Sequence, residues 1–151
     1  MIKVRDANRW DQSALFNMLR DFREATPIEA MSQCNNEEHV SQLFHMTLVG
    51  GGITLIAEKD NQPIGFIIGV IENTIWDGNF YVLREVAYWV DPEHRGSSAG
   101  YRLLHEYNRQ AKLLKEEKRI NVHTMSKLIN SPDLDYSKFG FRKVEEIWVA
   151  E

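Results

Sequence analysis

The first half of the chain places its hydrophobic residues at helical spacing in two separate segments. In residues 9–24 an apolar residue recurs every three or four positions, at Trp10, Ala14, Leu15, Met18, Leu19 and Phe22. In residues 36–49 the same spacing returns at Val40, Leu43, Phe44 and Leu48. Asn36, followed by two glutamates, is a typical helix start, and the glycines at 50–52 are typical of a helix end. We therefore expect two helices, with a loop over residues 26–36 because Pro27 stops the first.

Strand patterns occupy residues 2–7 and the middle of the chain. Residues 53–60 and 63–72 are two strand-like runs separated by Asp60, Asn61 and Gln62, a composition typical of a hairpin turn. Residues 79–91 are apolar at both odd and even positions. A strand of that kind is buried on both faces, so we expect it near the centre of the sheet.

The last third of the chain predicts a strand between two helices, and then a final strand. Helical spacing covers about residues 101–117, and residues 119–125 read as a strand. Ser131 and Pro132 predict the start of a short helix that runs to Phe139 and ends at Gly140. Residues 141–151 alternate apolar and charged side chains, as an edge strand does. Together these elements predict one α/β (α+β) domain, residues 1–151, with helices packed on a mixed sheet.

Composition narrows the protein classes further. The 151 residues are 43% hydrophobic and 26% charged, a balance normal for a globular domain, and the net charge of −4 disfavours nucleic-acid binding. A single cysteine, Cys34, excludes an internal disulfide and fits a reducing compartment. The sequence contains no apolar run of membrane-spanning length and no signal-peptide pattern. We expect a cytoplasmic protein without nucleic-acid or membrane partners, and its edge strands favour a homodimer.

Small residues gather directly before the third long helix, at Gly96, Ser97, Ser98, Ala99 and Gly100, after Arg95. The start of a helix offers free N–H groups and a partial positive charge, and small side chains let an anion approach. An arginine can pair with phosphate oxygens. The same composition also fits a tight turn with an N-cap serine. The glycine signatures of P-loop NTPases and of dinucleotide-binding folds are absent, so these two classes are disfavoured.

The segment from Arg95 to Gly100 resembles the coenzyme A pyrophosphate loop of the GNAT N-acetyltransferase superfamily, in which glutamine or arginine precedes spaced glycines. Residues 136–145, YSKFGFRKVE, are similar to a second signature of that family, Tyr-x-Lys-x-Gly-Phe. The predicted order of elements matches the family's order along essentially the whole chain. The resemblance implies a GNAT-like mixed, mostly antiparallel central sheet of about six strands with helices on both faces.

The resemblance also implies acetyl-CoA as co-substrate and no metal. The loop from Arg95 to Gly100 would hold the pyrophosphate, and the pantetheine arm would pair with the backbone of Tyr88, Trp89 and Val90. Two positions depart from the family pattern. Ser98 replaces the usual glycine, which would cost energy if the backbone there had positive φ. The position of a frequent cofactor-binding asparagine is Ile129, so the neighbouring Asn130 is the candidate contact.

Two residues are the candidate catalytic groups by the same resemblance. Tyr136 would donate a proton to the leaving thiolate, because a phenol is protonated at neutral pH. Glu85 would take a proton from the attacking amine, since a carboxylate on a desolvated strand can have a raised pKa. Glu72 and Asp77 are alternative bases. The spacing of Cys34 and of the five histidines indicates neither a nucleophile nor a metal site.

These features together predict an acetyl-CoA-dependent N-acetyltransferase that acts on a primary amine by direct attack in a ternary complex. The alternative is a non-catalytic coenzyme A-binding module or regulator of the same fold. The acceptor would be an amine of a small molecule or a protein. In the family, the region that corresponds to residues 24–36 and the last strand shape the acceptor site, and the acidic net charge favours a cationic amine.

Overall fold

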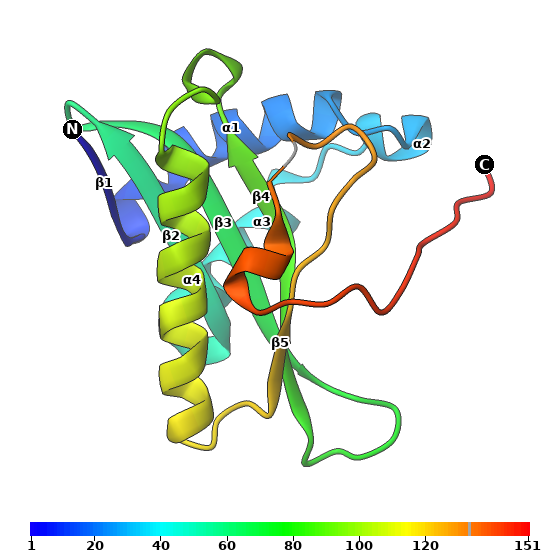
Figure 1. The fold of residues 1–151 in the computed structure, drawn as a ribbon. Helices are drawn as coiled ribbons and strands as arrows, with labels where there is room; N and C mark the ends of the chain where they lie inside the picture. Colours follow the sequence, from blue (N-terminus) through cyan, green and yellow to red (C-terminus); the bar gives the residue numbers. More distant parts are fainter. Residues whose placement is uncertain (133) are drawn as a thin grey trace.

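A five-stranded sheet forms the centre of the computed structural model, which describes residues 1–132 and 134–151 (Figure 1). Its strands lie in chain order: β1 (Ile2–Asp6), β2 (Gly52–Lys59), β3 (Gln62–Asn73), β4 (Tyr81–Val90) and β5 (Val122–Thr124). The first four pair antiparallel, and β5 pairs parallel to β4. The mixed, mostly antiparallel sheet is confirmed, although it has five strands where about six were expected.

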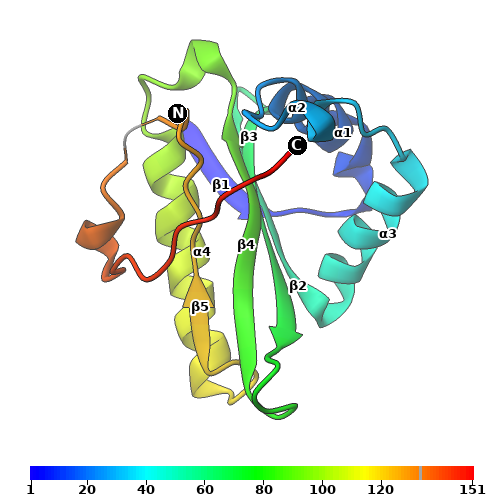
Figure 2. The same ribbon diagram turned by 90° about the vertical axis from the view of Figure 1, so that its right-hand side faces the viewer.

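Helices cover both faces of this sheet, as predicted (Figure 2). On one face lie α1 (Gln12–Glu24), the single turn α2 (Glu29–Ser32) and α3 (Glu37–Met46), and on the other lies α4 (Ala99–Glu116). Each side buries its own apolar cluster. The first contains Leu15, Met18, Phe44, Ile56, Phe66, Ile68, Ala87 and Trp89. The second includes Ile53, Leu55, Ile67, Leu83, Leu103, Leu104, Tyr107 and Ala111.

The structure confirms two local predictions, the Asn36 helix cap and the hairpin turn at residues 60–62. The Asn36 side chain accepts a hydrogen bond of 3.0 Å from the His39 amide, so it caps α3 as expected. Asp60 and Asn61 have φ values of 51° and 64° between β2 and β3. Two consecutive residues with positive φ form the type of hairpin turn that matches strand twist. The hairpin is therefore confirmed.

Two predicted segments near the site differ from the structure. The expected loop over residues 26–36 contains the extra turn α2. The prediction that Ser131 and Pro132 start a helix is wrong, because a 3-10 turn, η4, begins only at Tyr136 and ends at Phe139. Its cap is Asp135, whose carboxylate accepts a 3.0 Å hydrogen bond from the Ser137 amide. Position 133, inside the predicted helix, lies outside the described residues.

The prediction of a final strand over residues 141–151 is wrong. The segment has no regular secondary structure, and from residue 142 onward every side chain is exposed. An alternating pattern becomes a strand only where a neighbouring strand supplies hydrogen bonds, and β5 offers just three residues. The segment instead leaves η4 and runs past the β5 side of the sheet toward α2, where Glu151 accepts a 2.9 Å hydrogen bond from the Ala30 amide (Figures 1 and 2).

The sheet opens between β4 and β5. Residues 82–84 of β4 pair with residues 122–124 of β5, and β5 ends at Thr124. Among the described residues, no strand pairs with β4 on that side between Glu85 and Val90. This stretch, which we call the open edge of β4, leads directly to the loop before α4.

None of the described helices has both the length and the apolar character needed to span a bilayer.

Candidate active site

Unpaired backbone amides gather between the end of β4 and the first turn of α4. The chain makes a 3-10 turn, η3 (Pro92–His94), and then a loop in which the Ser97 amide donates to the His94 carbonyl at 3.0 Å. Within the described part of the chain, four amides here have no hydrogen-bond partner, those of Gly96, Ser98, Gly100 and Tyr101. Because they stand at the positive end of an 18-residue helix, they form a site suited to an anion.

Ser98 is not strained in this loop. Its φ is −80°, which is an ordinary value for any residue, so replacing the family's glycine costs no backbone energy. The Ser98 hydroxyl accepts a 2.9 Å hydrogen bond from Nε of Arg102, one turn along α4. The departure from the family pattern therefore leaves the backbone of the loop intact.

Arg95 is held against the end of β4. Its Nε donates to the Val90 carbonyl at 2.9 Å, and its guanidinium carbon lies 4.4 Å from the centre of the Trp89 ring. Stacking on an aromatic face fixes a guanidinium while leaving its terminal N–H groups at the rim. The arginine is thus at the loop, as the sequence predicts, but part of its hydrogen-bonding capacity is used within the protein.

The side chains of the three predicted pantetheine-binding residues are engaged away from the open edge. Tyr88 donates a hydrogen bond to the Gly100 carbonyl, which ties β4 to the first turn of α4. Trp89 donates from its indole nitrogen to Asp91 at 2.9 Å, and Val90 packs under α4. Their backbone remains on the open edge of β4. An extended ligand would therefore meet main-chain groups there.

Glu85 and Tyr136, 51 residues apart, meet at one peptide group of Ser126. The Ser126 amide donates to Oε1 of Glu85 at 2.9 Å, and the Tyr136 hydroxyl donates to the Ser126 carbonyl at 3.1 Å. Ser126 is the second residue after β5, which ends at Thr124, so this peptide lies where the sheet opens. The two candidate catalytic residues are brought together by a residue that the sequence did not single out.

Burial sets the protonation of this pair. The Glu85 side chain is only 5% exposed, and desolvation raises its pKa to about 7, although the Ser126 amide and the charge of Arg84 act to lower it. Desolvation, followed by the charge of Glu85, raises the pKa of Tyr136 above its usual value near 10. Near neutral pH, Glu85 can therefore accept a proton while Tyr136 keeps its own.

Three further polar side chains, those of His123, Asn108 and Tyr107, lie between the sheet and α4. Nε2 of His123 is 2.6 Å from Oδ1 of Asn108, and burial lowers the pKa of His123 to about 4, so the ring is neutral. The Tyr107 hydroxyl is fully buried and has no hydrogen-bond partner among the described residues. Tyr107 and Asn108 are neighbours on α4 and both are buried, so the covered face of this helix is partly polar.

The remaining candidates lie elsewhere. The Asn130 amide donates to the Ala25 carbonyl at 2.7 Å, at the end of α1, so its side chain is not directed to the loop before α4. Glu72 pairs with Arg84 at 2.6 Å, and Asp77 accepts a bond from the Asn79 amide at 2.8 Å in the β3–β4 turn; both carboxylates are exposed. Cys34 is exposed in the loop before α3.

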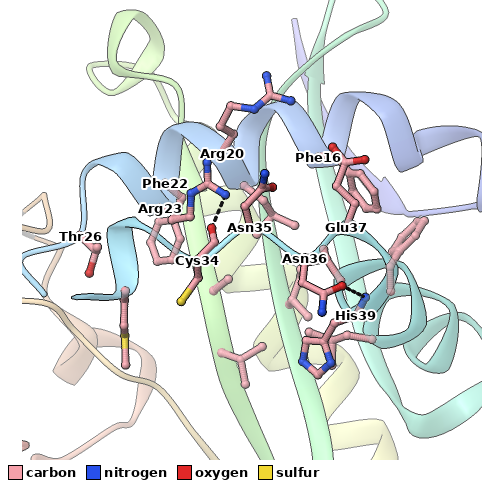
Figure 3. Close-up of a pocket in the computed structure, with 18 residues that line it drawn as sticks. Phe16, Arg20, Phe22, Arg23, Thr26, Cys34, Asn35, Asn36, Glu37 and His39 are labelled. Carbon is pink, nitrogen blue, oxygen red and sulfur yellow. Dashed lines mark hydrogen bonds between the residues drawn. The ribbon is translucent and has the colours of Figure 1, made fainter. Parts of the chain in front are cut away.

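A separate cavity of about 370 Å³, which we call the α1–α3 pocket, lies between α1, α3 and the sheet (Figure 3). Phe16, Arg20, Phe22 and Arg23 come from α1, and the loop before α3 supplies the opposite wall (Figure 3). Its floor is Ile68 of β3 with Val86 and Ala87 of β4. The pocket therefore reaches the same stretch of β4 that begins the open edge.

Comparison with known proteins agrees with this arrangement. A family model described as an acetyltransferase (GNAT) domain matches residues 50–143, more than half of the chain. A predicted acetyltransferase of Clostridium acetobutylicum, solved with acetyl-CoA, is similar with a TM-score of 0.77 and 19% identity over 100% of this chain and 96% of that one. No curated protein matches the chain.

Two further solved structures share the fold. An acetyltransferase of Trypanosoma brucei has a TM-score of 0.70 and 19% identity over 100% of this chain and 99% of that one. The Salmonella typhimurium protein yncA, solved with its cofactor acetyl-CoA, has a TM-score of 0.67 and 18% identity over 83% of this chain and 69% of that one. At sequence identities of 18–19%, these similarities establish a shared fold and nothing about the substrate.

Proposed function

This chain belongs to the GNAT acetyltransferase family, and from that premise we propose that it transfers an acetyl group from acetyl-CoA to an amine nitrogen. The observation that carries the proposal is the set of four unpartnered amides at the start of α4, those of Gly96, Ser98, Gly100 and Tyr101. They suit the diphosphate of a coenzyme, because backbone donors and the helix dipole act on the same anion.

The open edge of β4 supports the position of the acyl donor. From the α4 loop, the donor's arm would run along the backbone of residues 85–90 toward Ser126, in the manner of an added strand. A backbone N–H of this edge would hydrogen-bond the thioester carbonyl and stabilise negative charge on its oxygen during attack. The acetyl group would then lie beside the peptide that joins Glu85 and Tyr136.

Glu85 and Tyr136 would handle the two protons of the transfer. An amine substrate is mostly ammonium at neutral pH, and Glu85, directly or through a water, would take its proton so that the nitrogen can attack the carbonyl carbon. As the new C–N bond forms, the C–S bond breaks and the sulfur leaves with the electron pair. Tyr136 would give its hydroxyl proton to that sulfur.

Replacing Tyr136 with phenylalanine tests the acid. We expect kcat for thiol release to fall by about 100-fold, the lower end of what a positioned acid contributes. Acetyl-CoA binding and the melting temperature should change little, because the hydrogen bond to the Ser126 carbonyl is exposed. Steady-state kinetics with a thiol-reactive dye measures kcat, and calorimetry measures binding. An unchanged kcat would remove Tyr136 from the mechanism.

The alternative is a domain that binds acetyl-CoA without transferring the acetyl group. The observation in its favour is the side chain of Asn130, which is bonded to Ala25 and not directed to the donor's expected path. The same assay separates the two functions. A binding module gives a normal acetyl-CoA affinity and no amine-dependent thiol release with any acceptor.

A further inference from the structure

We propose that the α1–α3 pocket selects an acceptor whose amine is carried on an uncharged, apolar body, in preference to a polyamine or another polycation. This inference deepens the proposed acetyl transfer and rests on it for the identity of the reacting group. The lining of the pocket, its charges and its contact with β4 carry the inference.

The walls of the pocket are mainly hydrocarbon. Three phenylalanines, Phe16, Phe22 and Phe44, line it together with Leu19, Val40 and Leu43. A cavity of about 370 Å³ falls in the size range of small-molecule sites. A phenyl or alkyl group placed there leaves water for an apolar environment, which contributes about 25 cal/mol for each Å² of surface buried.

The charged residues that line the pocket oppose a polycation. Two basic residues, Arg20 and Arg23, line the pocket, against one acidic residue, Glu37. Figure 3 shows Arg23 directed at the carbonyl of Cys34, with which it forms a hydrogen bond, on the side of the pocket formed by α1. A second ammonium inside the pocket would lose its hydration among apolar walls near these arginines, at a high free-energy cost.

The chain as a whole has a net charge of −4, which at long range attracts cations. Selection inside a desolvated pocket depends on the groups in contact with the ligand, and here these groups are mainly apolar, with two arginines against one glutamate. We therefore expect an amine on an apolar body in place of the cationic acceptor that the composition alone indicates.

The floor of the pocket connects the acceptor to the chemistry. Ile68 pairs with Ala87 and the next residue, Gly69, pairs with Glu85, so Val86 is the extra residue of a β-bulge in β4. Val86 and Ala87 line the pocket, and Glu85 precedes them at the start of the open edge. An amine that extends from the pocket past this bulge reaches the edge where the thioester carbonyl is expected.

A pair of probe amines tests this selectivity. We expect kcat/KM for 2-phenylethylamine to exceed that for 1,4-diaminobutane by at least about 10-fold, because 1.4 kcal/mol of differential binding is enough for that ratio. Calorimetry, with and without coenzyme A, should give the same order of affinities. Equal or higher values for the diamine in both measurements would overturn the inference.

A charge placed in the wall of the pocket gives a second test. Val40, half-buried on α3, lines the pocket, and Val49, 84% exposed beyond α3, does not. Val40→Glu should weaken 2-phenylethylamine binding by at least about 10-fold and shift the preference toward the diamine, whereas Val49→Glu should change neither. Melting temperatures verify that both variants fold.

The two proposals fail in different ways. If acetyl-CoA does not bind the wild-type protein, acetyl transfer is wrong, while binding of 2-phenylethylamine that Val40→Glu abolishes still supports the apolar pocket. If acetyl-CoA binds but Val40→Glu and Val49→Glu have the same amine preference as the wild type, the selectivity of the pocket is wrong and the transfer chemistry stands.

Discussion

Replacing Glu85 with glutamine should lower kcat by at least about 100-fold, the lower end of what a positioned general base contributes. The amide has nearly the shape of the carboxylate and keeps an oxygen that can accept the 2.9 Å hydrogen bond from the Ser126 amide. The loss would therefore come from the missing base and not from a rearranged site. Stopped-time assays of amine acetylation at saturating acetyl-CoA measure it.

The pH dependence of kcat/KM is a second test of Glu85 as the general base. Only ionised Glu85 can take a proton, and its pKa is about 7, so kcat/KM of the wild type should rise with pH through about 7. In Glu85→Gln this rise should disappear. A rise near pH 7 that persists in the variant would assign it to another group, such as the amine.

The stability of the folded protein should fall with rising pH over the range in which kcat/KM rises. Burial raises the pKa of Glu85 from 4.5 to about 7, so the folded protein binds this proton more tightly than the unfolded chain. Its contribution to the free energy of unfolding is fully present below pH 4.5 and is lost as pH rises to about 7, a loss on the order of 3 kcal/mol. Urea unfolding should show that part of the pH dependence removed in Glu85→Gln.

Glu72→Gln is the matched control for the base. Glu72 is an exposed carboxylate on β3, paired with Arg84 at 2.6 Å, and the sequence left it as an alternative. Because an exposed ion pair contributes little, we expect near-normal kcat and stability. A collapse of kcat in Glu72→Gln together with activity in Glu85→Gln would exchange the two assignments.

Gly96→Asp should weaken acetyl-CoA binding by at least about 10-fold, because it places a negative charge among the amides that would hold the diphosphate. A side chain at Gly96 meets no atom within 4 Å, and its φ is not positive, so the fold should tolerate the change. A carboxylate near a helix N-terminus stabilises the helix. The melting temperature should therefore be unchanged or slightly higher while affinity falls.

Gly78→Asp serves as the control for this variant. Gly78 lies in the exposed turn between β3 and β4, where an added Cβ meets only the Asn73 side chain at 4.0 Å. The same charge there should leave acetyl-CoA affinity unchanged. Equal losses of affinity in both variants would mean that net charge, and not the loop, controls binding; no loss in either would exclude the loop as the diphosphate site.

The sequence predicted the elements whose signals are local. Helical spacing located α1, α3 and α4, the Asp60–Asn61 turn located a hairpin, and the small residues after Arg95 located the loop. Each of these depends on residues a few positions apart, so pattern and capping chemistry are sufficient. Glu85 and Tyr136 were named through family resemblance, and their spatial relation was not predicted.

The remaining features depend on contacts between distant segments. Ser126 joins Glu85 to Tyr136 only because β5 stops after three residues, and no sequence pattern encodes that length. The α1–α3 pocket needs α1 and α3 packed across the β4 bulge. Residues 141–151 alternate as a strand does, yet a strand requires a partner edge that their own sequence does not supply.

The most direct measurement is a titration of isotope-labelled protein with coenzyme A, followed through backbone amide NMR signals. We expect the amides of Gly96, Ser98, Gly100 and Tyr101 to shift first and furthest, and those of the open edge of β4 to follow. If these four signals stay in place while coenzyme A binds elsewhere, or if nothing in the spectrum moves at millimolar ligand, the start of α4 is not a coenzyme site.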